Sequence, residues 1–183
     1  MKTDPIEHLR TYLALNGFVP SVLLTILCYA VLLGARATPW GLAALAFPGT
    51  LAHELTHFII GFILRAKPSG LSLWPKRSGK GWRLGEVRFR RIGVLNGAFI
   101  ALAPVLLLPL GWLCLMHLSV PAWTTQHWIS WLATGYLSAT LLYASVPSLT
   151  DLKVGGLSLL GYLTVAVLCW AVLPILRSWL QWG

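Results

Sequence analysis

The segment from residue 41 to residue 64 reads GLAALAFPGTLAHELTHFIIGFIL. Its only ionisable side chains are His53, Glu54 and His57. A helix of about 24 residues is roughly 36 Å long, so this segment could cross a bilayer as a helix. Charged side chains are costly at the centre of a membrane helix, by about 2.5–3.5 kcal/mol for Asp, Lys or Arg, so their presence there indicates a function.

The spacing of these three residues is typical of a metal site. His53 and His57 are four residues apart, so a helix places both on one face and lets both imidazoles reach one ion. Glu54 is placed to take a proton from a water on that ion. A lone membrane histidine is more often a packing residue, and chance matches to this pattern occur in soluble proteins. Three ionisable residues at ligand spacing are hard to explain by packing, and we predict a metal site.

The composition of the whole chain agrees with a membrane location. Of its 183 residues 57% are hydrophobic and only 10% charged, whereas a soluble domain has about 25% charged residues. We therefore expect one integral membrane domain over residues 1–183, in contact with the lipid bilayer. Cys28, Cys114 and Cys169 lie in apolar runs without paired spacing, so they are expected to pack as small hydrophobic side chains.

The pattern predicts an all-α polytopic fold with about five transmembrane helices. Pro48 lies about one turn before His53, which predicts a kink or a loosened turn just outside the site. Apolar runs of membrane-spanning length cover residues 18–35, 41–64, 93–118, 128–146 and 155–176.

The loop at residues 65–92 is basic and holds nine of the fourteen Lys and Arg residues. The positive-inside rule places such a loop in the cytoplasm, so the net charge of +9 indicates topology and no nucleic-acid partner. Alternation of the spans then gives a multi-pass protein with a cytoplasmic N-terminus and an outside C-terminus. We expect the membrane to be the cell membrane of a prokaryote. Within the loop, Leu71–Trp74 and Glu86–Arg90 alternate apolar and polar around a turn-like Ser78–Gly81, which predicts a short β-hairpin at the membrane surface.

A catalytic zinc usually has three protein ligands and one open position. Asp151 is favoured as the third ligand because it follows a span that runs in the same direction as residues 41–64, beside Pro147 and Gly155, which can open the helix. The other acidic candidates are Asp4, Glu7 and Glu86, and Glu86 lies among arginines with which it is expected to pair.

Asp151 has a second interpretation, as a membrane-boundary aspartate paired with Lys153. His57 would lie roughly 12 Å below the cytoplasmic boundary, while Asp151 is two residues from a lysine. Asp151 can be a ligand only if the segment from Pro147 dips back into the membrane or Lys153 snorkels to its surface.

Together these residues resemble the intramembrane zinc metalloproteases of the site-2 protease type. The resemblance is carried by the His53-Glu54-Leu55-Thr56-His57 motif and by Asp151, with weaker support from Asn96-Gly97 and Ala103-Pro104. It covers roughly residues 41–156. It implies one zinc ion per chain held by His53, His57 and Asp151, with Glu54 as the base. It also implies an endopeptidase that hydrolyses peptide bonds in or near transmembrane segments of membrane-protein substrates.

In that family a sheet or hairpin after the motif helix is thought to engage the substrate. The candidate substrate-binding residues here are accordingly Glu86, Val87, Arg88, Phe89 and Asn96. The chain departs from the family around the third ligand, where Val146-Pro147-Ser148 and Asp151-Leu152 replace the common Asn-Pro and Asp-Gly elements. It also leaves no room for a PDZ domain, and so resembles a minimal or divergent member.

Two other functions remain open. A divalent-metal carrier or sensor could use the same histidines, but it would not need Glu54 and would show more polar residues along a path through the membrane. A proteolytically inactive zinc-binding membrane protein could keep every one of these residues. The sequence carries no signal for the oligomeric state.

Overall fold

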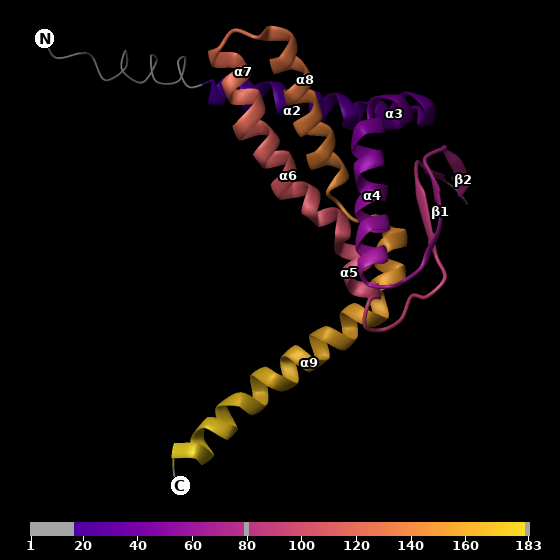
Figure 1. Cartoon of the computed structure of the whole chain (residues 1–183), viewed down its shortest axis with the longest axis vertical. Helices are drawn as coiled ribbons and strands as arrows, with labels where there is room; N and C mark the ends of the chain where they lie inside the picture. The colour runs from indigo at the N-terminus through magenta and orange to yellow at the C-terminus, as the bar shows by residue number, and fades with distance from the viewer. Residues whose placement is uncertain (1–16, 79–80, 182–183) are drawn as a thin grey trace, which may run out of the picture.

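The computed structural model describes residues 17–78 and 81–181. This part of the chain is mostly helical, with a small antiparallel sheet between α4 and α5 (Figure 1). The helical elements are α2 (Phe18–Gly34), η1 (Ala35–Ala37), α3 (Pro39–Leu45), α4 (Phe47–Ile63), α5 (Gly97–Leu102), η2 (Ala103–Leu106), α6 (Leu107–Cys114), η3 (Leu115–Ser119), α7 (Val120–Thr124), α8 (Trp128–Ala144) and α9 (Leu149–Gln181). The strands are β1 (Pro68–Ser72), β2 (Lys76–Ser78), β3 (Gly81–Arg83) and β4 (Glu86–Phe89).

Three helical stretches in the described chain are long and apolar enough to cross a membrane. They are Phe18–Ala37 with 20 residues, Gly97–Thr124 with 28 and Leu149–Ala171 with 23. They coincide with the predicted spans at residues 18–35 and 93–118 and with most of the span predicted at 155–176. The fold is thus that of a helical membrane protein.

The other two predicted spans fold into shorter helices. Residues 128–146 form α8, and residues 41–64 form α3 and α4, which meet at Ala46. Because α4 and α8 have 17 residues each, each is about 26 Å long. Pro48 occupies the second position of α4, where its missing N–H has no helical partner to lose. The break that Pro48 predicted therefore lies at the beginning of the motif helix.

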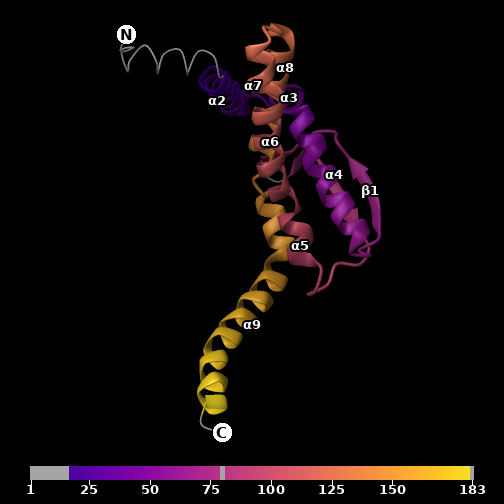
Figure 2. The same cartoon turned by 60° about the vertical axis from the view of Figure 1, so that its left-hand side comes forward.

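Helix α2 crosses the helices it packs against (Figures 1 and 2). At the crossing with α8, Leu24 packs against the bare backbone of Gly135, and the Trp131 indole N–H donates to the Ser21 hydroxyl at 3.0 Å. This differs from the expected set of side-by-side spans, because a small residue and a polar anchor on α8 favour close contact at one point.

Helix α4 lies close to α8 at the level of the motif. The backbone of Gly49 on α4 approaches Thr140 on α8 so closely that a side chain there would overlap the Thr140 carbonyl. Below this contact, the buried side chains of Leu107, Cys114, Leu141 and Ala144 form an apolar core. The contact brings the first histidine of the motif next to the end of α8.

Helix α9 continues away from the end of α8 and does not fold back beside it (Figures 1 and 2). The four-residue link 145–148 joins the two helices, and α9 begins at Leu149, six residues before the predicted fifth span. A C-terminus on the outside of the membrane, as predicted, would require the chain to reverse its direction between residues 146 and 155. The chain does not reverse its direction in that segment. The physical reason is that the first turns of α9 pack against α5.

The packing of α9 on α5 depends on a glycine. A side chain at Gly155 would overlap Ala101 and would come within 3.0 Å of the Gly97 carbonyl oxygen. One turn later, the buried Ser158 hydroxyl accepts a hydrogen bond from the Ala98 N–H at 2.9 Å. These contacts fix the beginning of α9, and with it Asp151.

The predicted hairpin is confirmed as a small antiparallel sheet. β1 pairs with β4, with Leu71 opposite Val87, and β2 pairs with β3, with Ser78 opposite Gly81. Of the expected turn, residues 79 and 80 lie outside the described residues. The ring of Phe89 lies against the bare backbone of Gly61 on α4, which docks β4 on the motif helix.

The glycine contact between α9 and α5 gives a first prediction. Gly155→Ala should lower the stability, by roughly the 1–3 kcal/mol typical of overpacking, because the added methyl group overlaps Ala101. Gly156→Ala is the matched control, because its added methyl group meets nothing within 4 Å and alanine is the better helix former. Thermal unfolding of the two variants in detergent measures the difference. Equal melting temperatures would contradict the packing described.

Candidate metal centre

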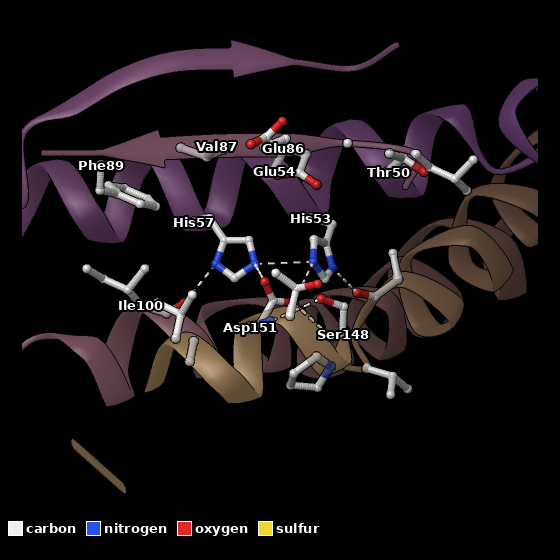
Figure 3. Close-up of a pocket in the computed structure, with 18 of the residues that line it drawn as sticks. Thr50, His53, Glu54, His57, Glu86, Val87, Phe89, Ile100, Ser148 and Asp151 are labelled. Carbon is white, nitrogen blue, oxygen red and sulfur yellow. Dashed lines mark hydrogen bonds and ion pairs between the residues drawn. The ribbon is translucent and has the colours of Figure 1, made fainter. Parts of the chain in front are cut away.

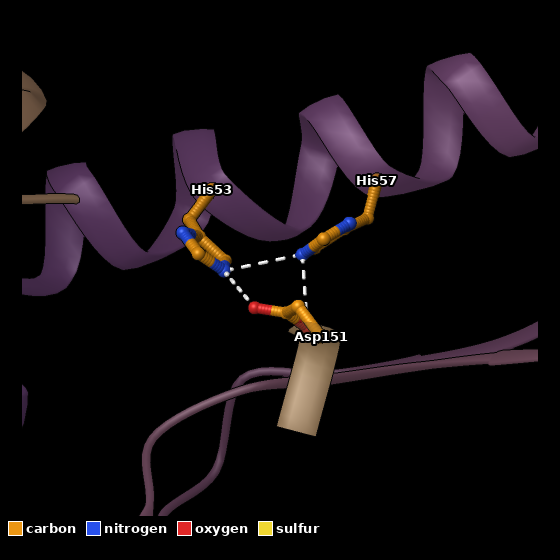
Figure 4. Close-up of side chains that lie close together, drawn as sticks. All are labelled: His53, His57 and Asp151. Atoms are coloured by element: carbon orange, nitrogen blue, oxygen red, sulfur yellow. Dashed lines mark hydrogen bonds and ion pairs between the residues drawn. The ribbon is translucent and has the colours of Figure 1, made fainter. Parts of the chain in front are cut away.

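Three side chains from two helices converge on one point (Figure 4). The Nε2 atoms of His53 and His57 on α4 are 3.2 Å apart. The Asp151 carboxylate on α9 brings Oδ2 to 3.4 Å from Nε2 of His53 and Oδ1 to 3.2 Å from Nε2 of His57. The predicted i, i+4 face and the predicted third residue are therefore brought together as a group that can hold a metal ion.

Each imidazole is fixed from behind by a backbone carbonyl. The Nδ1 of His53 lies 2.7 Å from the Ala144 oxygen at the end of α8, and the Nδ1 of His57 lies 2.7 Å from the Ile100 oxygen in α5. Because a carbonyl can only accept, each Nδ1 donates to the carbonyl behind it, and each Nε2 faces the other ring and the Asp151 carboxylate. Metal-binding histidines are usually oriented in this way.

The arrangement fits a cation. Two imidazole nitrogens and a carboxylate face one another at 3.2–3.4 Å, and positive charge among them, carried by a proton or a metal ion, stabilises the carboxylate. With one ligand atom taken from each of the three residues, these atoms lie within 4.8 Å of one another. The residues present can therefore hold a metal ion between them.

Asp151 lies beside the two histidines because the link between α8 and α9, at residues 145–148, also lies beside them. The Ser148 N–H donates to Oδ2 of Asp151 at 2.7 Å, and the Asp151 N–H donates to the Ser148 hydroxyl at 3.2 Å. These reciprocal bonds cap the beginning of α9, where the helix dipole also favours a carboxylate. Its ion-pair contacts are with the histidines, whereas Lys153 is exposed. The boundary interpretation, in which Asp151 pairs with Lys153, is therefore wrong.

Glu54 lies beside this group and is nearly buried, with 7% of its surface exposed. It belongs to the same pocket but not to the ligand group. Its carboxylate packs against the backbone of Gly85, just before β4, where any side chain would overlap it. The sheet therefore determines the surroundings of Glu54, while α5 and α8 determine those of the histidines.

The pocket has a volume of about 650 Å³ and lies between β4 and α4 on one side and α5 and α9 on the other (Figure 3). Of the predicted substrate residues, Glu86, Val87 and Phe89 line it. Arg88 is exposed and pairs with Glu86 at 3.2 Å, as was expected for Glu86 among its arginines. Val87 and Phe89 share one face of the strand, whereas Glu86 reaches the pocket from the beginning of β4 and Arg88 does not line it.

Asn96 lies outside the pocket lining and holds the turn before α5. Its Oδ1 accepts from the Gly93 N–H at 2.7 Å, and its Nδ2 donates to the Arg91 oxygen at 3.1 Å. The structure therefore places it as a residue that caps a turn.

Sequence reasoning missed several parts of the site. The carbonyls of Ile100 and Ala144 carry no side-chain signal, so only the fold reveals them. Arg36 and Tyr143 also line the pocket. The one sequence signal for Arg36 was its isolation, as a single charge between two apolar runs.

Comparisons with protein families, curated proteins and solved structures find no match to this chain. The geometry of the site is therefore the feature that indicates a function.

The converging ligands predict metal binding. We expect about one zinc ion per purified chain, lost in the His53→Ala, His57→Ala double variant. Asp151→Asn replaces a charged ligand. It should therefore weaken zinc binding by more than the roughly 10–100-fold that is typical when a hydrogen-bond partner of a ligand is lost. Lys153→Gln is the control and should keep the zinc. Elemental analysis and a chelator competition measure this, and unchanged zinc content in the double variant would contradict the site.

Proposed function

We propose that this chain is a zinc-dependent intramembrane endopeptidase, similar to the site-2 protease type. The observation that carries the proposal is the position of Glu54, a nearly buried carboxylate in the same pocket as the three ligand side chains. A site that only stores or senses a metal has no use for a proton acceptor next to its ligands.

Zinc is the metal that the ligands favour. Two imidazoles and one carboxylate form a ligand set of hydrolytic zinc sites, which keep a fourth position open. A zinc ion held by His53, His57 and Asp151 would supply Lewis-acid activation of a water molecule and of a peptide carbonyl. The carbonyls behind the histidines would keep both rings aimed at the ion.

Glu54 would act as general base and then as general acid. It would accept the proton of the attacking water and return it to the amine that leaves when the peptide bond breaks. Its contact with the Gly85 backbone restricts the carboxylate to the pocket side of α4. A held carboxylate loses little freedom on reaction, and this favours the transfer.

Strand β4 would hold the substrate. It lines the pocket, and in the described chain it pairs with β1 on one edge only. An extended peptide could add to its other edge and place its carbonyls along the pocket. A transmembrane substrate would first unwind there, because helical hydrogen bonds shield the bond to be cut. Membrane proteins with a transmembrane segment are accordingly the proposed substrates.

The proposed membrane arrangement has α4, α8 and the Gly97–Thr124 stretch crossing the bilayer, while α2 lies across them and α9 leads away from the end of α8 (Figures 1 and 2). The loop at residues 65–92 would face the cytoplasm, because exposed cations including Arg65, Lys67, Lys76 and Arg90 gather on it. The cell membrane of a prokaryote remains the proposed location. The orientation of the C-terminus is not part of the proposal, because α9 does not fold back beside α8.

The proton acceptor gives the decisive prediction. Glu54→Gln keeps the shape and all three ligands, so zinc should remain while cleavage falls by roughly 10²–10⁴-fold. The measurement is mass spectrometry of new N-termini in membranes of cells that express wild type or variant, together with zinc analysis of both. The matched control is Lys153→Gln, an exposed charge that should leave cleavage unchanged. Equal sets of new termini from wild type and Glu54→Gln would end the protease proposal, and zinc transport in both would favour a carrier.

The orientation of the basic loop gives a separate prediction. Lys76 is exposed on β2, so a cysteine placed there should react with a thiol reagent. In sealed cells a reagent that cannot cross the membrane should leave it unlabelled, and permeabilised cells should restore the label. The background variant lacks Cys28, Cys114 and Cys169. Labelling in sealed cells would reverse the proposed orientation.

A further inference from the structure

We propose that the Arg36–Tyr143 end of the pocket is a subsite for a carboxylate of the substrate. The inference rests on the proposed function of the neighbouring metal centre. It specifies the substrate class, namely chains that carry an acidic side chain or a free C-terminus near the bond to be cut.

The guanidinium of Arg36 is held in place. Its Nε–H donates to the Tyr143 hydroxyl at 2.9 Å, and its Cζ lies 5.1 Å from the centre of the same ring. The Tyr143 ring is itself packed edge-on against Tyr29 of α2, with ring centres 5.8 Å apart. Because the Nε–H is used, the two terminal amino groups of Arg36 are the donors left to bind a ligand.

This pair lies next to the metal centre. Tyr143 directly precedes Ala144, whose carbonyl oxygen is 2.7 Å from Nδ1 of His53. Arg36, Tyr143 and the ligand residues also line one continuous pocket. A ligand that reaches the metal centre and extends along the pocket towards α2 would therefore meet the guanidinium.

A single basic side chain lines this end of the pocket. Among the described residues that line the pocket, Arg36 is the one Lys or Arg, and its side chain is exposed. The rest of the lining combines the apolar side chains of Val87, Phe89 and Ile100 with the carboxylates beside the candidate metal centre. A planar guanidinium binds carboxylates by paired hydrogen bonds.

The polarity of the pocket fixes the orientation of the substrate. An apolar part would lie along β4, and an acidic group would lie towards the α2–α3 end. An extended transmembrane segment with an acidic residue on one side of the cut bond meets both requirements.

The test uses small hydroxamates of the form HONH–CO–(CH₂)n–COO⁻ and their primary-amide twins. The hydroxamate end binds zinc in both, so only the far end differs. With the zinc-loaded full chain in detergent, we expect the carboxylate form to bind roughly 10–100-fold tighter than its twin at the chain length that spans the pocket. Isothermal titration calorimetry measures both.

Arg36→Gln should abolish this preference and leave the affinity of the amide twin unchanged, which shows that the variant is folded. Tyr143→Phe should reduce the preference, because it removes the hydroxyl that holds the guanidinium. Equal affinities of the twins at every chain length, or a preference that survives Arg36→Gln, would overturn the subsite and leave the metal centre standing. Failure of both twins to bind the zinc-loaded wild type would overturn the metal centre and the subsite together.

Discussion

The structure depends on one constraint, the meeting of two imidazole nitrogens from α4 and a carboxylate from α9 within 3.4 Å. Contacts made elsewhere in the fold hold these side chains at that separation. On α4, the i, i+4 spacing of His53 and His57 brings both rings to one face. Asp151 comes from a different helix, and its position requires α9 to begin at the depth of the motif. The short link after α8, and the departure of α9 away from α8, follow from this requirement.

The helices meet this constraint through small residues and backbone groups. Gly49 lets α4 approach α8, so that the Ala144 carbonyl reaches His53. Gly155 lets α9 approach α5, the helix whose Ile100 carbonyl reaches His57. The contact at Gly49 therefore also brings the Ala144 carbonyl to His53. The contact at Gly155 also positions Asp151, because it fixes the beginning of α9. In an apolar surrounding, where helices gain little from hydrophobic burial against one another, close backbone packing of this kind is the main source of precision.

The sequence predicted those features that depend on local spacing. The face of α4 shared by His53 and His57, the break at Pro48 and the hairpin after α4 follow from periodicity and proline chemistry, and the structure has all three. The separation of Asp151 from Lys153 in the sequence could not show that Asp151 lies beside the histidines. That position depends on where α9 packs. The direction of α9 was mistaken for the same reason. Backbone carbonyls and the crossing of α2 over α8 depend on tertiary contacts, which leave no pattern in the sequence.

The two sides of the pocket have separate supports. The ligands come from α4 and α9 and are held by α5 and α8, whereas Glu54 faces the sheet and packs against Gly85. Under the proposed function, a substrate strand on β4 would meet Glu54 from the side of the sheet, while the candidate metal ligands are held from the side of α5 and α8. Because Glu54 and both histidines lie on α4, one helix already sets the relative positions of the carboxylate and of the two imidazoles that such a strand would meet.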